Sequence, residues 1–87
     1  MAIAFIPAML REITGGATRV EVDAATLRDV VAALEQRFPG MAEALIEDGA
    51  LRPGVTISTG GEGTTNSLSD PVGTDTEVHF LLAISGG

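Results

Sequence analysis

Along the chain, the pattern of apolar and polar positions first predicts a hairpin. The segment 3–9, IAFIPAM, is rich enough in apolar residues for a strand, although Pro7 favours an edge position or an early end. TRVEVD at 18–23 alternates valines with polar and charged residues, as a strand with one buried face does. TGG at 14–16 is typical of a turn, so the two strands are expected to pair.

The final strand has the clearest alternation. EVHFLLAI at 77–84 switches between two faces at every step, and PGVTIST at 53–59 predicts another strand before it. Between them, 59–76 is polar and rich in glycine, threonine and serine, and we expect a long loop or one brief strand between turns. Only Leu68 and Val72 in that stretch are expected to reach a core. In 77–84, one face holds Val78, Phe80, Leu82 and Ile84, and the other holds His79, Leu81 and Ala83.

One amphipathic helix is predicted in the first half of the chain. Its apolar residues recur at spacings of 3, 4, 7 and 11 from the first member. Thr26 followed by Asp29 is similar to a capping box, and Pro39-Gly40 is a stop signal. The stripe consists of Leu27, Val30, Val31, Leu34 and Phe38, and the opposite face, expected to be solvated, of Arg28, Asp29, Glu35 and Arg37.

The order of these elements predicts the fold class. A short helix over 41–47 and a turn at Asp48-Gly49 follow the main helix, so the order is strand, strand, helix, short helix, strand, loop, strand. This order favours an α+β domain with a mixed sheet and the main helix packed across one face. If the first and last strands are neighbours at the centre, they run parallel, with the helix in the crossover. We expect a single domain over 1–87.

Composition narrows the class of protein. Apolar residues make up 45% of the 87 residues and aromatic residues only 3%, so the core of a single domain must be mainly aliphatic. Without cysteine there is no disulfide, no thiolate nucleophile and no cysteine-ligated metal. No segment approaches the length of a membrane span, and the apolar start lacks a basic leader. The expectation is a cytoplasmic protein that does not bind membranes.

Charge argues against nucleic acid as a partner. The net charge is −7, and every positive side chain is an arginine. Phosphate backbones would repel such a chain, whereas a basic protein surface would attract it. Because lysine is absent, no side chain offers an amine that could accept an acyl group.

No sequence pattern is typical of an enzyme active site. His79 is the only imidazole, and a partly exposed strand histidine is favoured over a catalytic one, because no constrained serine or cysteine accompanies it. No second histidine or cysteine is available for a metal site. TGGEG at 59–63 lacks the GK[ST] ending and the following helix of a phosphate loop, so we interpret it as a flexible turn.

The chain closes with Ser-Gly-Gly almost directly after the last predicted strand. A free carboxylate is ionised at neutral pH and is a poor electrophile, but activation as an acyl-adenylate turns it into a reactive acyl group. Glycines have no Cβ, so a glycine tail can enter a narrow channel and leaves its last carbonyl unhindered. A frayed end is the alternative, but a short arm on a strong strand favours a working tail.

Three segments together resemble the MoaD/ThiS family of ubiquitin-like sulfur carriers. MLREITGG at 9–16 is similar to that family's first-strand-to-turn segment, and VEVDAATLRDVVAALEQRFPGM at 20–41 to its second strand and main helix. EVHFLLAISGG at 77–87 is similar to its last strand and diglycine tail. The resemblance covers nearly the whole chain. It implies a β-grasp fold, with a mixed four- to five-stranded sheet, one main helix on one face and a flexible tail projecting at 85–87.

The resemblance also implies a carrier without catalytic activity of its own. A MoeB/ThiF-like activating enzyme would use ATP to adenylate the carboxylate of Gly87, which follows Gly86, and sulfur would replace an oxygen to give a thiocarboxylate. The sulfur would pass to a synthase that makes molybdopterin, thiamin, cysteine or a secondary metabolite. No permanently bound cofactor and no metal is implied. Without cysteine, labile sulfur has no other place on this chain than the terminus.

Three other roles stay open on the sequence alone. A ubiquitin-like modifier would be conjugated through Gly87 to lysines of target proteins. A permanent small subunit of a synthase would copurify with it in a fixed ratio. A plain adaptor domain would tolerate the loss of its tail.

The face of the last strand that points away from the helix is expected to bind a partner. Leu81 lies on that face, and a small domain has little reason to expose a leucine unless something covers it. Pro7 and His79 would lie beside Leu81 if the first and last strands are neighbours, and Arg11 follows closely along the chain. Ser85, at the base of the tail, completes the expected partner-binding set.

Overall fold

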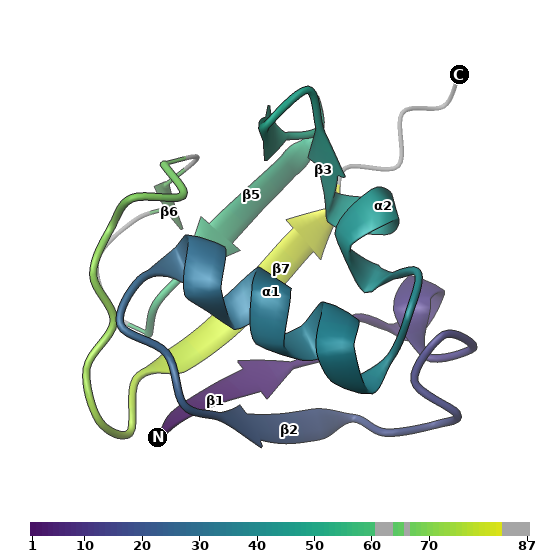
Figure 1. Cartoon of the computed structure of the whole chain (residues 1–87), viewed down its shortest axis with the longest axis horizontal. Coiled ribbons are helices and arrows are strands. Elements are labelled where there is room, and N and C mark those ends of the chain that lie inside the picture. The colour runs from purple at the N-terminus through teal and green to yellow at the C-terminus, as the bar shows by residue number, and fades with distance from the viewer. Residues whose placement is uncertain (61–63, 66, 83–87) are drawn as a thin grey trace.

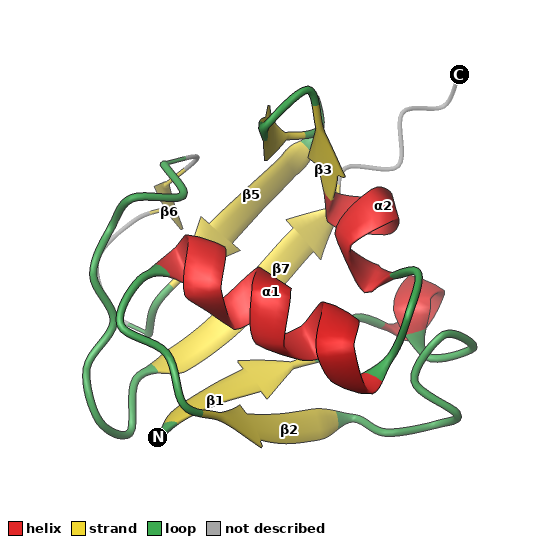
Figure 2. Ribbon diagram, in the orientation of Figure 1, coloured by secondary structure: helices red, strands yellow, loops and turns green. Residues whose placement is uncertain are grey.

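Two layers make up the part of the chain that the structure describes: a mixed sheet and a helix across one of its faces (Figure 1, Figure 2). The computed structural model describes residues 1–60, 64, 65 and 67–82. The strands of the sheet are β1 (Ala2–Phe5), β2 (Arg19–Val22), β5 (Val55–Ser58), β6 (Thr64–Thr65) and β7 (Glu77–Leu82). They lie side by side in the order β2-β1-β7-β5-β6.

The condition stated for the first and last strands is met: they are neighbours within this sheet, and they run parallel as expected for that case. Ile3 of β1 lies opposite Glu77 of β7, and Phe5 lies opposite His79. β2 pairs antiparallel with β1, and β5 pairs antiparallel with β7, so both parallel strands have a partner on each side. A parallel pair requires a crossover connection, and the main helix α1 (Leu27–Arg37) lies within it. The α+β class with a mixed sheet is confirmed.

The first strand is shorter than predicted. The expected strand at 3–9 ends at Phe5, and Ala8–Leu10 form a short 3-10 helix, η1. Pro7 explains the change, because its nitrogen cannot donate to a strand ladder and its φ of −65° suits the start of a helical turn. The Pro7 carbonyl then accepts a hydrogen bond from the amide of Leu10 at 2.9 Å.

The helix α1 begins and packs as its sequence predicts. Thr26 is the N-cap, and its side-chain oxygen accepts a hydrogen bond from the Asp29 amide at 3.3 Å. Four members of the apolar stripe are buried, and Phe38 is half-buried just after the helix. The core between helix and sheet is mainly aliphatic, with Phe80 the only aromatic residue among its buried members in the described ranges. The largest fully buried side chains are those of Ile6, Leu27, Leu34, Met41, Leu45 and Ile57.

The polar stretch before β7 is tied to the start of α1. The expected brief strand is β6, which pairs with β5. Leu68 is 4% exposed and belongs to the core, and its carbonyl accepts from the Arg28 amide at 2.8 Å. The Asp70 carbonyl accepts from the Leu27 amide at 3.0 Å. These bonds satisfy amides in the first turn of α1 that have no partner within the helix.

A small hairpin that the sequence did not predict follows the main helix. The second helix, expected over 41–47, ends early, and its last two residues pair instead with a strand beyond the Asp48-Gly49 turn. Both turn residues have positive φ, 56° and 82°, as in the turns that favour two-residue hairpins. Strands of two residues are too short to show an alternating pattern. The elements are α2 (Met41–Leu45), β3 (Ile46–Glu47) and β4 (Ala50–Leu51).

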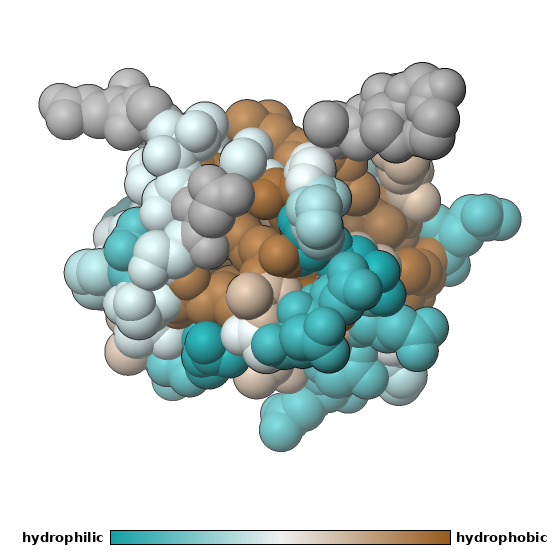
Figure 3. Space-filling view, turned by 90° about the horizontal axis from the view of Figure 1, so that it is seen from above, coloured by the Kyte–Doolittle hydropathy of each residue, from teal (hydrophilic) through white to brown (hydrophobic). Residues whose placement is uncertain are grey.

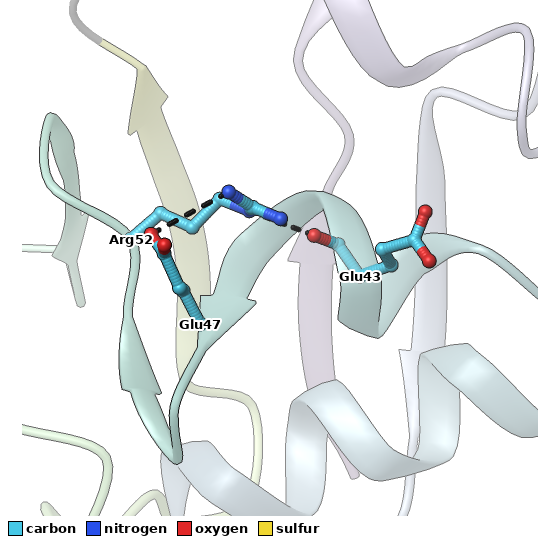
Figure 4. A network of polar contacts seen from close by, with 3 residues as sticks. All are labelled: Glu43, Glu47 and Arg52. Carbon is cyan, nitrogen blue, oxygen red and sulfur yellow. Dashed lines mark hydrogen bonds and ion pairs between the residues drawn. The ribbon is translucent and has the colours of Figure 1, made fainter.

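Arg52 fastens this hairpin to α2 (Figure 4). Its Nε donates to the Glu43 carbonyl at 2.8 Å, and its Nη1 lies 3.5 Å from Glu47 Oε1. The side chains of Arg52 and Glu47 are 40% and 50% exposed, so their ion pair contributes at most about 1 kcal/mol to the free energy of unfolding.

Glu35 has a structural role that its place on the polar face of α1 does not suggest. Its Oε1 accepts hydrogen bonds from the amides of Gly40 at 3.0 Å and Ala42 at 2.9 Å. Gly40 has a φ of 109°, a left-handed conformation that turns the chain sharply between the two helices. One side-chain oxygen of α1 therefore holds the start of α2. The expectation of a purely solvated residue was wrong for Glu35.

Replacing this oxygen should loosen the connection between the helices. We expect Glu35→Ala to lower the free energy of unfolding by about 1–2 kcal/mol, because two amides lose their acceptor. Glu35→Gln keeps an acceptor oxygen at the same distance and should recover most of that loss. Urea denaturation followed by circular dichroism measures both variants. Equal unfolding midpoints for the alanine and glutamine variants would show that the carboxylate does not support the turn.

Candidate functional site

The outer face of β7 exposes the residues that the alternation predicted. Val78 and Phe80 point to the core and are 0% and 4% exposed, whereas Leu81 is 45% exposed. His79 is half-buried on the outer side, across from Phe5 of β1. This division follows from the period of two along a strand, which places successive side chains on opposite faces.

A cleft of about 350 Å³ lies on this outer face. The structure brings four of the predicted partner-binding residues into it, because β1 and β7 are neighbours and η1 follows directly after β1. Ser85, the fifth predicted residue, lies outside the described residues, as do Gly86 and Gly87. The side chains that line the cleft include those of Phe5, Pro7, Arg11, Arg19, His79 and Leu81.

Three of these side chains form a row across the strands β2, β1 and β7. The pairing places Arg19 opposite Phe5 and Phe5 opposite His79. The Phe5 and His79 rings are stacked, with centroids 4.4 Å apart and an angle of 6° between their planes. The Arg19 guanidinium lies 5.8 Å from the centroid of the Phe5 ring. At the other end of the row, His79 Nε2 is 3.3 Å from Glu77 Oε1.

Sequence reasoning missed Phe5 and Arg19 as members of this site. The signal was present, because the same period of two that buries Ala4 and Val20 turns their neighbours outward. What the sequence lacks is the cross-strand pairing that sets the two residues beside His79. Phe5 is one of only three phenylalanines, and it stands on the outer face instead of in the core.

The cleft is positively charged although the chain is acidic. Arg11 Nε donates to the Ile6 carbonyl at 3.2 Å, which fixes the guanidinium beside the cleft. No carboxylate of the described residues forms an ion pair with Arg11 or Arg19, whereas Arg52 pairs with Glu47. Two guanidinium groups without a carboxylate partner therefore line one hollow of a chain with net charge −7.

The outer face has the chemistry of a binding surface. His79 contacts an aromatic ring and a carboxylate but no hydroxyl nucleophile in the hydrogen bonds of the described residues. Across residues 1–60, 64, 65 and 67–82, no group of three or more histidine and acidic side chains is placed to hold a metal ion. No helix in this part of the chain is both long enough and apolar enough to cross a membrane. Of the predicted turn 59–63, the last three residues lie outside the described ranges.

The described part of β7 ends against the core. Leu82, its last residue, pairs with Val55 and packs against the core. In Figure 1, β7 runs toward the upper right, and Figure 3, seen from above, shows apolar residues gathered in the middle of the view with hydrophilic residues to one side.

Solved structures provide the comparisons, since no protein-family model and no curated protein sequence matches the chain significantly. The chain is 26% identical to a chain of the Amycolatopsis orientalis BexX/CysO complex, with a TM-score of 0.91 and 100% of both chains covered. It is 27% identical to Mycobacterium tuberculosis CysO, an antigen, with a TM-score of 0.86 over 97% of this chain and 100% of that one. It is 29% identical to SAMP1 from Haloferax volcanii, with a TM-score of 0.73 over 99% and 98% of the two chains.

These neighbours share the β-grasp architecture, a mixed sheet with one main helix on one face, and they are small carrier proteins. The resemblance inferred from three segments of the sequence thus extends to the three-dimensional structure. The chain is a β-grasp protein similar over its whole length to ubiquitin-like sulfur carriers of the MoaD/ThiS type.

Proposed function

We propose that the chain carries sulfur on the carboxyl group of Gly87. A carboxylate oxygen attacks the α-phosphorus of ATP in the active site of an activating enzyme, and pyrophosphate leaves. A sulfur nucleophile then displaces AMP, and the resulting thiocarboxylate donates its sulfur to a biosynthetic synthase. The protein itself acts as a co-substrate and not as a catalyst. The pathways that the resemblance allows are those to molybdopterin, cysteine, thiamin and sulfur-containing secondary metabolites.

The observation that carries this proposal is the position of β7. The strand pairs with β1 through residues 77–79 and with β5 through residues 79–82, and Leu82 is its last described residue. A tail that starts from a fixed strand end has a limited range, so the domain sets where its last atoms go once a partner has docked. Gly86 and Gly87 suit entry into a narrow active site because they have no side chains.

The comparisons support a partner that covers part of the domain. One similar structure is a complex of BexX and CysO, so a neighbour of this chain is seen bound to another protein. For the present chain, we assign docking of the activating enzyme to the outer face around Leu81. Pro7, Arg11 and His79 line the same cleft, and we propose that Ser85 contacts the partner where the tail begins.

A second function, that of a protein modifier, is favoured by the likeness to SAMP1, which belongs to a group of ubiquitin-like carriers and modifiers. A modifier would form an isopeptide bond between Gly87 and a lysine of another protein. The two functions differ in what accumulates in cells. Immunoblots of cell extracts under denaturing conditions show a ladder of higher-mass conjugates for a modifier, and only the free chain for a pure carrier.

Changing the length of the tail should abolish activation. Deleting Gly87 withdraws the carboxylate by about 3.5 Å, and adding an alanine after Gly87 moves it forward by a similar distance and introduces a Cβ. Errors of even ~1 Å at a reacting group can cost on the order of a hundredfold in rate. We expect both variants to melt at the parental temperature and to lose ATP–pyrophosphate exchange with the activating enzyme. Exchange near the parental rate in the deletion variant would mean that Gly87 is not the activated residue.

A charge placed at Leu81 should block docking without unfolding the domain. Because Leu81 is 45% exposed, Leu81→Arg should keep the parental melting temperature, whereas Phe80→Arg, at a position 4% exposed, should unfold the protein. In ATP–pyrophosphate exchange, we expect the Leu81 variant to raise the KM for the carrier at least about tenfold, as loss of a central contact does.

The matched control is Ala32→Arg, which adds the same charge at an exposed position of α1 on the other side of the sheet. Its KM should equal that of the parent. If Leu81→Arg also behaves like the parent, the activating enzyme does not use the outer face. If Leu81→Arg unfolds, the residue belongs to the core.

A further inference from the structure

We infer that the outer-face cleft binds one carboxylate side chain of the partner protein, held by Arg11 and Arg19, with an apolar neighbour of that side chain against Leu81. The inference rests on the proposed function only in taking this partner to be the activating enzyme. Its basis is the contrast between the cleft and the rest of the molecule. The chain carries −7 in total, yet the hollow is lined by two arginines that no described carboxylate pairs with.

The other three arginines of the chain do not line this cleft. Arg52 pairs with Glu47 and donates to a backbone carbonyl, while Arg28 and Arg37 donate to the carbonyls of Gly49 and Glu21. These three therefore fasten neighbouring segments of the fold. Arg11 and Arg19 differ from them because both border the same hollow.

Arg11 has the geometry to bind a carboxylate with two parallel hydrogen bonds. It is the C-cap of η1, and its Nε already donates to the Ile6 carbonyl at 3.2 Å. This bond restrains the guanidinium, so binding costs less side-chain entropy than for a free arginine. The two terminal nitrogens can then donate as a fork, the arrangement that makes arginine–carboxylate pairs strong and specific.

Arg19 is supported by the row of rings beside it. Its guanidinium lies over the Phe5 ring, and Phe5 is stacked on His79, so the side chain rests on an ordered surface. A guanidinium on an aromatic face keeps its nitrogens free to donate in the plane of the group. Two restrained arginines at one cleft create a local positive potential against the acidic background of the chain.

The apolar half of the cleft selects among anions. Phe5, Pro7 and Leu81 provide hydrocarbon surface next to the two guanidinium groups. A glutamate or aspartate followed by an aliphatic residue matches both halves, whereas a phosphate backbone would meet the repulsion of the whole chain. The acidic exterior and the cationic cleft together require a partner whose basic surface contains one acidic residue. Such a pattern fixes the orientation of docking and rejects partners that lack it.

Peptide titration of the full chain tests the cleft without any activating enzyme. The probes are a leucine–glutamate–leucine peptide, acetylated and amidated at its ends, and the same peptide with glutamine in place of glutamate. Binding is measured by the changes in the amide chemical shifts of the ¹⁵N-labelled protein. We expect the glutamate peptide to shift the amides around Arg19, His79 and Leu81 and to bind at least about threefold more tightly than the glutamine peptide. Equal binding of both peptides, or shifts elsewhere on the surface, would overturn the inference.

Charge-neutral variants identify the arginines responsible. Arg19→Gln and Arg11→Gln should each weaken binding of the glutamate peptide about three- to tenfold, and Arg28→Gln, which removes the same charge from α1, should leave it unchanged. Because Arg11 also donates a hydrogen bond to Ile6, replacing it can change the local structure as well as the charge, whereas Arg19→Gln changes mainly the charge of the cleft. The melting temperatures of all three variants are measured as a control for folding. Equal effects of Arg19→Gln and Arg28→Gln would show attraction by overall charge alone. Stronger binding of inorganic phosphate than of the glutamate peptide to the same amides would make the cleft a phosphate site.

ATP–pyrophosphate exchange then separates this inference from the proposed function. With a MoeB/ThiF-like enzyme, Arg19→Gln should raise the KM for the carrier about three- to tenfold at unchanged kcat, and added salt should reduce the difference. If the parent is adenylated and the variant has the parental KM, the inference is wrong and the proposed function stands. If the parent is not adenylated, the proposed function is wrong, and the peptide titration alone decides the cleft.

Discussion

The parallel pairing of β1 with β7 is the constraint on which the rest of the structure depends. It places the last described strand between two partners, with β1 on one side and β5 on the other. A shift of one residue would turn Val78 and Phe80 out of the core and bring Leu81 in, so burial fixes the register as firmly as the hydrogen bonds do. The same register sets His79 opposite Phe5 on the outer face, and the pairing of β1 with β2 adds Arg19 on the other side of Phe5. The composition of the cleft therefore depends on both partners of β1.

The two faces of the sheet divide stability and recognition between them. The inner face packs aliphatic side chains against α1, and Leu68 from the loop before β7 completes that core. The outer face carries stacked rings, two arginines and an exposed leucine around a cleft. Because strand residues alternate between faces, a substitution on the outer face can leave the packing of the core unchanged.

Much of the fold could be predicted because the strong patterns are long. The apolar stripe of α1 and the alternation of β7 are each visible over several repeats; α1 lies where it was expected, and so does β7 over 77–82, while the predicted strand residues Ala83 and Ile84 lie outside the described residues. The hairpin of β3 and β4 has only two residues in each strand, and no periodicity can be seen over so short a length. The end of β1 at Phe5 depends on Pro7, whose effect was correctly expected as an early end but not as a 3-10 helix.

For the site, the sequence identified the residues that alternation exposes and missed those that depend on pairing. Leu81, His79, Pro7 and Arg11 line one cleft because β1 and β7 are neighbours, an arrangement that sequence reasoning stated only as a condition. Arg19 joins them only through its position opposite Phe5, which no pattern within one segment reveals.

The proposal that Gly87 carries sulfur is tested most directly by the intact mass of the protein. The full chain is incubated with ATP, a MoeB/ThiF-like activating enzyme and a sulfur source, and is then analysed by mass spectrometry, with a sample lacking ATP as the control. We expect an ATP-dependent gain in mass equal to the replacement of one oxygen by sulfur, with fragmentation placing the added sulfur on Gly87. An unchanged mass after incubation with an enzyme that does adenylate the chain, or a gain located at another residue, would contradict the proposal.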